Sequence, residues 1–81
     1  MNWKEFFNKD SFTDQELNEA HRIAERQMLK ARTLSDKFPH HEGGDLHRQY
    51  QASIEIMGTI DQIRVYPELA HKFIQRIEKY L

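Results

Sequence analysis

Three histidines supply the residue types of a metal site. His40, His41 and His47 lie within eight residues, with Glu42 and Asp45 between them. Imidazole and carboxylate groups are the ligands that zinc and similar ions take in proteins. The spacing does not follow the zinc patterns of paired ligands, and the segment also contains two glycines. We interpret it as a solvated polar turn, with a metal site or a pH-sensitive patch as alternatives.

Basic residues form a second pattern on the predicted helix over 14–37. Arg22, Arg26, Lys30 and Lys37 project onto one stripe at 100° per residue. Such a stripe can follow the phosphates of a nucleic acid. Glu19 lies on the same stripe, and the net charge of the chain is −1. We therefore favour a solvated helix face and keep nucleic-acid binding as the alternative function.

Motifs of enzymes are missing from the sequence. It has no phosphate-binding glycine loop, no His-Glu-x-x-His and no cysteine. Glu68 and His71 match the Glu-x-x-His step of di-iron bundles, but such a site needs a second copy of the step and further inward glutamates. We expect no catalytic residues and no cofactor.

Aromatic residues are concentrated near the N-terminus, where Trp3, Phe6, Phe7 and Phe12 fall within twelve residues. One interpretation is that they cover an open end of the helical core. The other is that they anchor a protein partner, because aromatic side chains dominate the hot spots of interfaces. For this second interpretation we single out Trp3 and Phe7.

Two long helices are predicted to carry the basic stripe and to flank the histidine segment. The first begins with a capping box, Thr13 to Glu16, and its apolar residues recur every three or four positions, with three alanines that permit close helix packing. Pro39 ends it, and Asp45 can cap a second helix over 45–65. That helix has apolar residues on two sides, which indicates a central position. Its Gly58 marks a bend or a close helix approach.

Pro67 suits the first position of a third helix. The apolar face of this helix consists of Leu69, Ala70, Phe73, Ile74, Ile77, Tyr80 and Leu81. Because it is shorter than the hairpin before it, we expect the hairpin end at 38–44 to stay partly uncovered. Exposed apolar patches mark association sites. The predicted partner-binding residues at this end are Leu34, Phe38, Leu46 and Tyr50.

Composition sets the remaining limits. The chain has 81 residues, 31% of them charged with both signs interspersed, and no apolar run long enough to span a membrane. We expect one all-α domain over residues 1–81 in the cytoplasm: an antiparallel three-helix bundle with a short N-terminal helix. The predicted function is that of a non-enzymatic regulator, inhibitor or adaptor in a bacterial or phage-like setting. Its predicted partner is another protein or a second copy, with nucleic acid disfavoured and no membrane.

Overall fold

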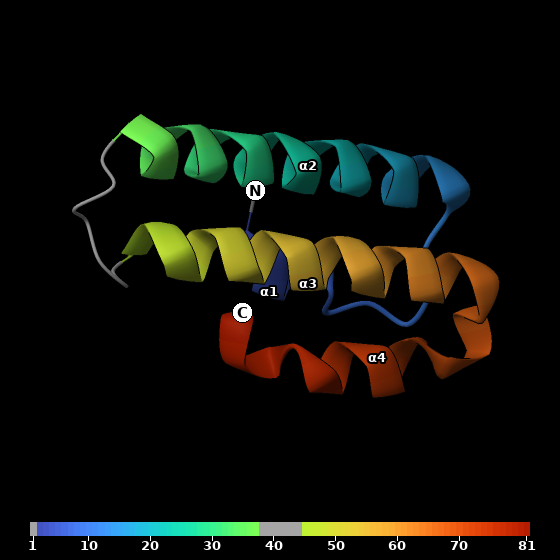
Figure 1. Ribbon diagram of the computed structural model, residues 1–81. Helices are drawn as coiled ribbons and strands as arrows, with labels where there is room; N and C mark the ends of the chain where they lie inside the picture. Colours follow the sequence, from blue (N-terminus) through green and yellow to red (C-terminus); the bar gives the residue numbers. More distant parts are fainter. Residues whose placement is uncertain (1, 38–44) are drawn as a thin grey trace.

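The computed structural model describes residues 2–37 and 45–81, and within these ranges the protein is entirely helical (Figure 1). The helices are α1 (Trp3–Phe6), α2 (Asp14–Lys37), α3 (Asp45–Val65) and α4 (Ala70–Arg76). Two 3₁₀ turns, η1 (Pro67–Leu69) and η2 (Glu78–Tyr80), flank α4. The predicted fold class is confirmed: a long α2–α3 hairpin is joined by a shorter C-terminal helix and a short N-terminal one.

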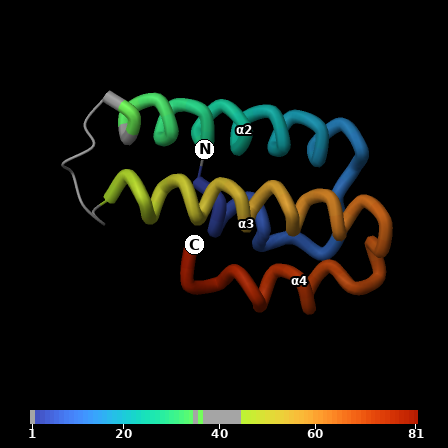
Figure 2. The backbone as a smooth tube through the Cα atoms, viewed as in Figure 1, coloured from blue at the N-terminus to red at the C-terminus, as the bar shows by residue number. Residues whose placement is uncertain are grey.

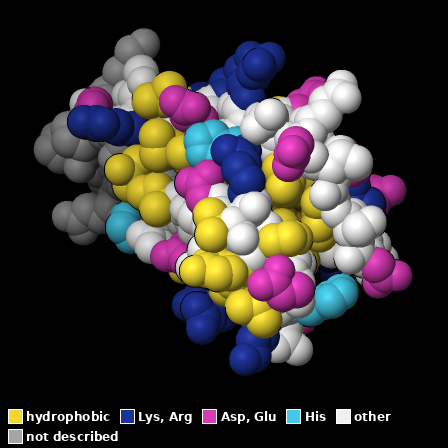
Figure 3. Space-filling view, turned by 90° about the vertical axis from the view of Figure 1, so that its right-hand side faces the viewer, with side chains coloured by type: hydrophobic (Ala, Val, Ile, Leu, Met, Phe, Trp, Pro, Cys, Tyr) yellow, Lys and Arg dark blue, Asp and Glu magenta, His cyan; other side chains and the backbone are white. Residues whose placement is uncertain are grey.

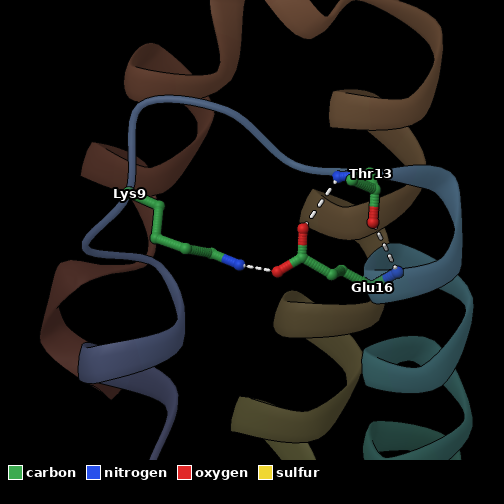
Figure 4. Close-up of polar contacts among 3 residues, drawn as sticks. All are labelled: Lys9, Thr13 and Glu16. Atoms are coloured by element: carbon green, nitrogen blue, oxygen red, sulfur yellow. Dashed lines mark hydrogen bonds and ion pairs between the residues drawn. The ribbon is translucent and has the colours of Figure 1, made fainter.

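The capping box at the start of α2 is present as predicted (Figure 4). The backbone N–H of Glu16 donates to Thr13 Oγ1 at 3.1 Å, and the backbone N–H of Thr13 donates to Glu16 Oε1 at 3.0 Å. Lys9 Nζ donates to the other carboxylate oxygen of Glu16. One carboxylate therefore caps α2 and also holds the N-terminal segment against it.

These contacts keep the Glu16 carboxylate ionised at lower pH than usual, and they link the stability of the fold to its charge. The hydrogen bond from Lys9, followed by those from the Thr13 backbone and side chain, lowers the pKa of Glu16 from 4.5 to about 2. A lowered pKa stabilises the fold above pH 4.5, and this contribution is lost as the pH falls towards 2. We expect Glu16→Gln to flatten the loss of stability over that range, measured by urea unfolding at several pH values. An acid dependence as steep as in the wild type would contradict this role.

The α2–α3 hairpin packs through small residues. Ala20, Ala24 and Ala31 are fully buried on α2, as predicted from their spacing. Ala20 and Ala24 belong to one core with the buried isoleucines of α3, namely Ile56, Ile60 and Ile63. Two polar contacts fix the antiparallel register: Arg64 donates to Asn18 Oδ1 at 2.8 Å, and His21 Nε2 lies 3.6 Å from Asp61 Oδ1.

The N-terminal segment crosses one side of the hairpin, passing behind α3 in Figure 2. Phe7 is only 3% exposed and belongs to the same core as Ala24, Ile60 and Phe73. Trp3, Phe6 and Phe12 are half-buried and pack against that core. The aromatic residues thus cover the core, but they do so on one side of the hairpin and not at an open end, as the first interpretation expected.

The C-terminal segment differs from the prediction of one continuous helix from Pro67. It runs back along α3, but Leu69 and Ile77 leave helical geometry, with ψ angles of 13° and 10°. Each is closed by a 3₁₀ bond, Leu69 to Tyr66 and Ile77 to Ile74. The tighter turns move Leu69 out of the apolar face, so it is 39% exposed, while Ala70, Phe73 and Ile77 stay buried.

Gly58 lies in the middle of α3 on the solvent side. A Cβ atom built at this position would meet nothing within 4 Å, so no helix of the described chain approaches closely there. Glycine in a helix interior costs about 1 kcal/mol relative to alanine. Gly58→Ala should therefore raise the free energy of unfolding by up to about 1 kcal/mol in chemical denaturation. Destabilisation by this change would show that Gly58 has a packing role.

No helix in the described part of the chain is long and apolar enough to cross a membrane.

Candidate protein-binding surface

One side of the α2–α3 hairpin is left bare by the other described elements. The N-terminal segment lies on the far side in Figures 1 and 2, and α4 packs along the lower edge of α3. At 100° per residue, Tyr50, Ile54 and Met57, spaced four and three residues apart, project onto the same side of α3 as Asp61, the neighbour of His21. We call this side the hairpin face. Its apolar residues are Met28 of α2 and Tyr50, Ile54 and Met57 of α3.

These apolar side chains are incompletely buried within one chain. Ile54 is 37% exposed, and Met28, Tyr50 and Met57 are half-buried. Figure 3 looks along the hairpin from the end where α2 begins and α3 ends, and it shows hydrophobic groups at the surface of that end with acidic, basic and histidine side chains between them. Apolar side chains within a charged frame are typical of protein-binding surfaces.

Charged groups frame the hairpin face at both ends. At one end His21 lies 3.9 Å from Glu25 and 3.6 Å from Asp61, which places these three residues on one side of the hairpin. At the other end a shallow hollow of about 240 Å³ is lined by Arg32, Asp36, Leu46, His47, Tyr50 and Gln51. Both helices thus contribute acidic and basic groups around the apolar centre.

The loop-end residues predicted from the sequence are partly buried, as expected. Leu34, Leu46 and Tyr50 are half-buried, and Leu46 and Tyr50 share the hollow at Arg32. Phe38 lies outside the described residues. Of the predicted residues, Tyr50 therefore belongs to the hairpin face, and Leu46 lines the hollow at its end.

Trp3 and Phe7, the N-terminal residues predicted to bind a partner, lie in different environments in the structure. Phe7 is buried in the core. Trp3 is half-buried, and its Nε1–H donates to Gln27 Oε1 at 3.2 Å. Trp3 therefore stays partly accessible at the surface, whereas Phe7 is part of the core.

The basic stripe lies on the outward side of α2. Arg22, Arg26 and Lys30 are exposed, and so is Glu19. The side chain of Lys37 lies outside the described part of the chain. The described stripe therefore mixes both signs of charge, as a solvated helix face does.

The histidine cluster falls largely outside the described residues, because His40, His41 and Glu42 are not among them. His47 is exposed at the start of α3. Within residues 2–37 and 45–81, no group of three or more histidine or acidic side chains is arranged so that it could hold a metal ion. Glu68 and His71 are both exposed, and His71 faces Asp10 at 3.9 Å.

Sequence reasoning did not single out Met28, Ile54 and Met57 as site residues. A signal was present: His47, Tyr50, Ile54, Met57 and Asp61 follow alternating steps of three and four, which is the spacing of a helix–helix seam. The path of the N-terminal segment decides which side of the hairpin stays uncovered, and the sequence pattern does not give that path.

The fold and this surface define a small helical bundle with an uncovered apolar face. Comparison of the chain with models of protein families, with curated proteins and with solved structures gives no match.

Proposed function

We propose that this protein is a non-enzymatic protein-binding module and that the hairpin face is its binding surface. The observation that carries the proposal is the exposure of Ile54, in the middle of the central helix and between two half-buried residues of the same seam. Burying such a side chain contributes about 1.5–3 kcal/mol for a full transfer from water. Because Ile54 is 37% exposed, a partner that covers the hairpin face gains roughly a third of this free energy, about 0.5–1 kcal/mol, from this side chain.

The form of the surface supports a protein partner. Methionine side chains adapt to irregular neighbours, and a tyrosine adds a rigid aromatic contact with a polar end. Met28, Met57 and Tyr50 provide both kinds of contact along one strip. A helix is the shape that fits a strip with steps of three and four residues.

Affinity capture from the native host tests the proposal, with the chain as bait and quantitative mass spectrometry as readout. We expect bound protein to be lost with Ile54→Asp. Leu69→Asp is the matched control, because Leu69 has almost the same exposed fraction, 39% against 37%, and lies in η1. Circular dichroism checks that both variants fold. Equal capture by both variants would show that the hairpin face is not the binding surface.

A further inference from the structure

The charged residues of the hairpin face are placed symmetrically about one level along the hairpin. This level follows from the alignment of α2 with α3. His21 of α2 lies beside Asp61 of α3. Seven residues along α2 is Met28, and seven residues back along α3 is Ile54. Because the helices are antiparallel and seven residues make about two turns in each, Met28 and Ile54 lie at the same level of the hairpin.

On α2 the charges on either side of this level are opposite in sign. Glu25 lies one turn before Met28, and Arg32 lies one turn after it. A two-fold axis that is perpendicular to α2 and passes between Met28 and Leu29 would place each Glu25 opposite the Arg32 of a second copy. The same rotation would place His21 opposite Asp36 of that copy.

On α3 the same rotation gives a second set of complementary groups. His47 lies seven residues before Ile54, and Asp61 lies seven residues after it. Rotation about Ile54 would therefore place His47 opposite the Asp61 of the second copy, and Ile54 opposite Ile54. The centre of symmetry on α2, between Met28 and Leu29, and the centre on α3, at Ile54, thus lie at the same level of the hairpin to within half a residue.

From this order we propose that the partner of the hairpin face is a second copy of this chain, packed face to face. In this dimer α2 lies antiparallel to the second copy's α2, and α3 lies antiparallel to the second copy's α3. The proposal rests on the proposed function and names the partner of the same surface. Such an interface is isologous, so each complementary contact occurs twice.

The charges also fix the register of this arrangement. Sliding one copy by seven residues along α2 would place Glu25 against Glu25 or Arg32 against Arg32. Like charges across an interface disfavour association, whereas complementary charges fix the register. The central strip of Met28, Ile54 and Met57 supplies the apolar area that the charges frame.

Charge reversal tests the register. In sedimentation over a range of concentrations we expect a reversible dimer for the wild type. Glu25→Arg and Arg32→Glu should each weaken it by about tenfold or more, because each creates two like-charge contacts. The double variant should return to within a few-fold of the wild type. Arg26→Glu, with the same change of charge on the outward side of α2, should leave dimerisation unchanged.

Cysteine cross-linking tests the geometry without depending on affinity changes, since the natural chain has no cysteine. The symmetric contact brings the two copies of residue 54 together, and disulfides form when Cα atoms lie about 4.4–6.8 Å apart. We expect Ile54→Cys to give a disulfide-linked dimer rapidly under mild oxidation. Leu69→Cys, which lies away from the hairpin face, should remain largely unlinked.

The outcomes separate the two proposals. A wild-type chain that sediments as a monomer at every concentration overturns the dimer, and so does a double charge variant that is weaker than either single variant. Equal cross-linking at residues 54 and 69 would also overturn it. If the chain is monomeric but Ile54→Asp still abolishes capture of another protein, the proposed function stands and the second copy is excluded. If Ile54→Asp changes neither result, both proposals fail.

Discussion

Replacing Phe7 with alanine is expected to lower the free energy of unfolding by about 3–5 kcal/mol, the range for removing a fully buried phenylalanine. Phe7 is 3% exposed, and its ring lies 5.0 Å from that of Phe6 and 6.0 Å from that of Trp3. The truncation therefore leaves a cavity and also removes aromatic contacts. Small domains have total stabilities of about 5–15 kcal/mol, so the loss is a large share.

Urea unfolding followed by circular dichroism measures this loss, and the single tryptophan reports the N-terminal segment directly. Trp3 fluorescence should shift to the red at lower urea in Phe7→Ala, because the segment detaches when its anchor is lost. Phe6→Ala is the matched control, since Phe6 is half-buried and its loss should cost less. If Phe7→Ala costs no more than Phe6→Ala, the segment does not belong to the core.

Local signals in the sequence predicted the helices well because each depends on neighbouring residues. Thr13 and Glu16 lie within one turn, so their reciprocal hydrogen bonds follow from spacing alone. The alanines of α2 recur with the helix period, and all three that were expected in the seam are buried. The bounds of α2 and α3 follow from Thr13 at the start of one and Asp45 at the start of the other.

The structure differs from the prediction where packing between segments that are distant in sequence determines the conformation. Phe7 fits equally well in a lid or in an exposed anchor until its neighbours are known, and its burial depends on Ala24 and Ile60, which come much later in the chain. The C-terminal segment has a helical pattern throughout, yet it tightens into 3₁₀ turns at Leu69 and Ile77 where it meets α3.

The candidate surface depends on the same kind of information. Ile54 was expected on a second apolar side of a central helix, and it does lie on a different side from Ile56 and Ile60. The sequence could not show that the short α1 and the loop after it would occupy only one side of the hairpin. The bare side is therefore a consequence of chain topology, whereas its spacing and charge order are visible in the sequence once that side is known.

Enlarging Ala24 to leucine tests the close packing on which the hairpin depends. Ala24 is fully buried in the seam between α2 and α3, so three extra carbon atoms have to displace a neighbouring isoleucine or move the helices apart. Overpacking of this kind costs about 1–3 kcal/mol. We expect a lower midpoint in both thermal and urea unfolding.

Ala52→Leu is the matched control for this substitution. Ala52 is half-buried in α3 and lines a hollow of about 360 Å³ with Trp3 and Tyr80, so a larger side chain has room there. The same change of residue should thus destabilise the protein at Ala24 and leave it nearly unchanged at Ala52. An Ala24→Leu variant as stable as the wild type would mean that α2 does not pack on α3 through its alanines. The alignment of Met28 with Ile54 would then rest on the polar contacts at Asn18 and His21 alone.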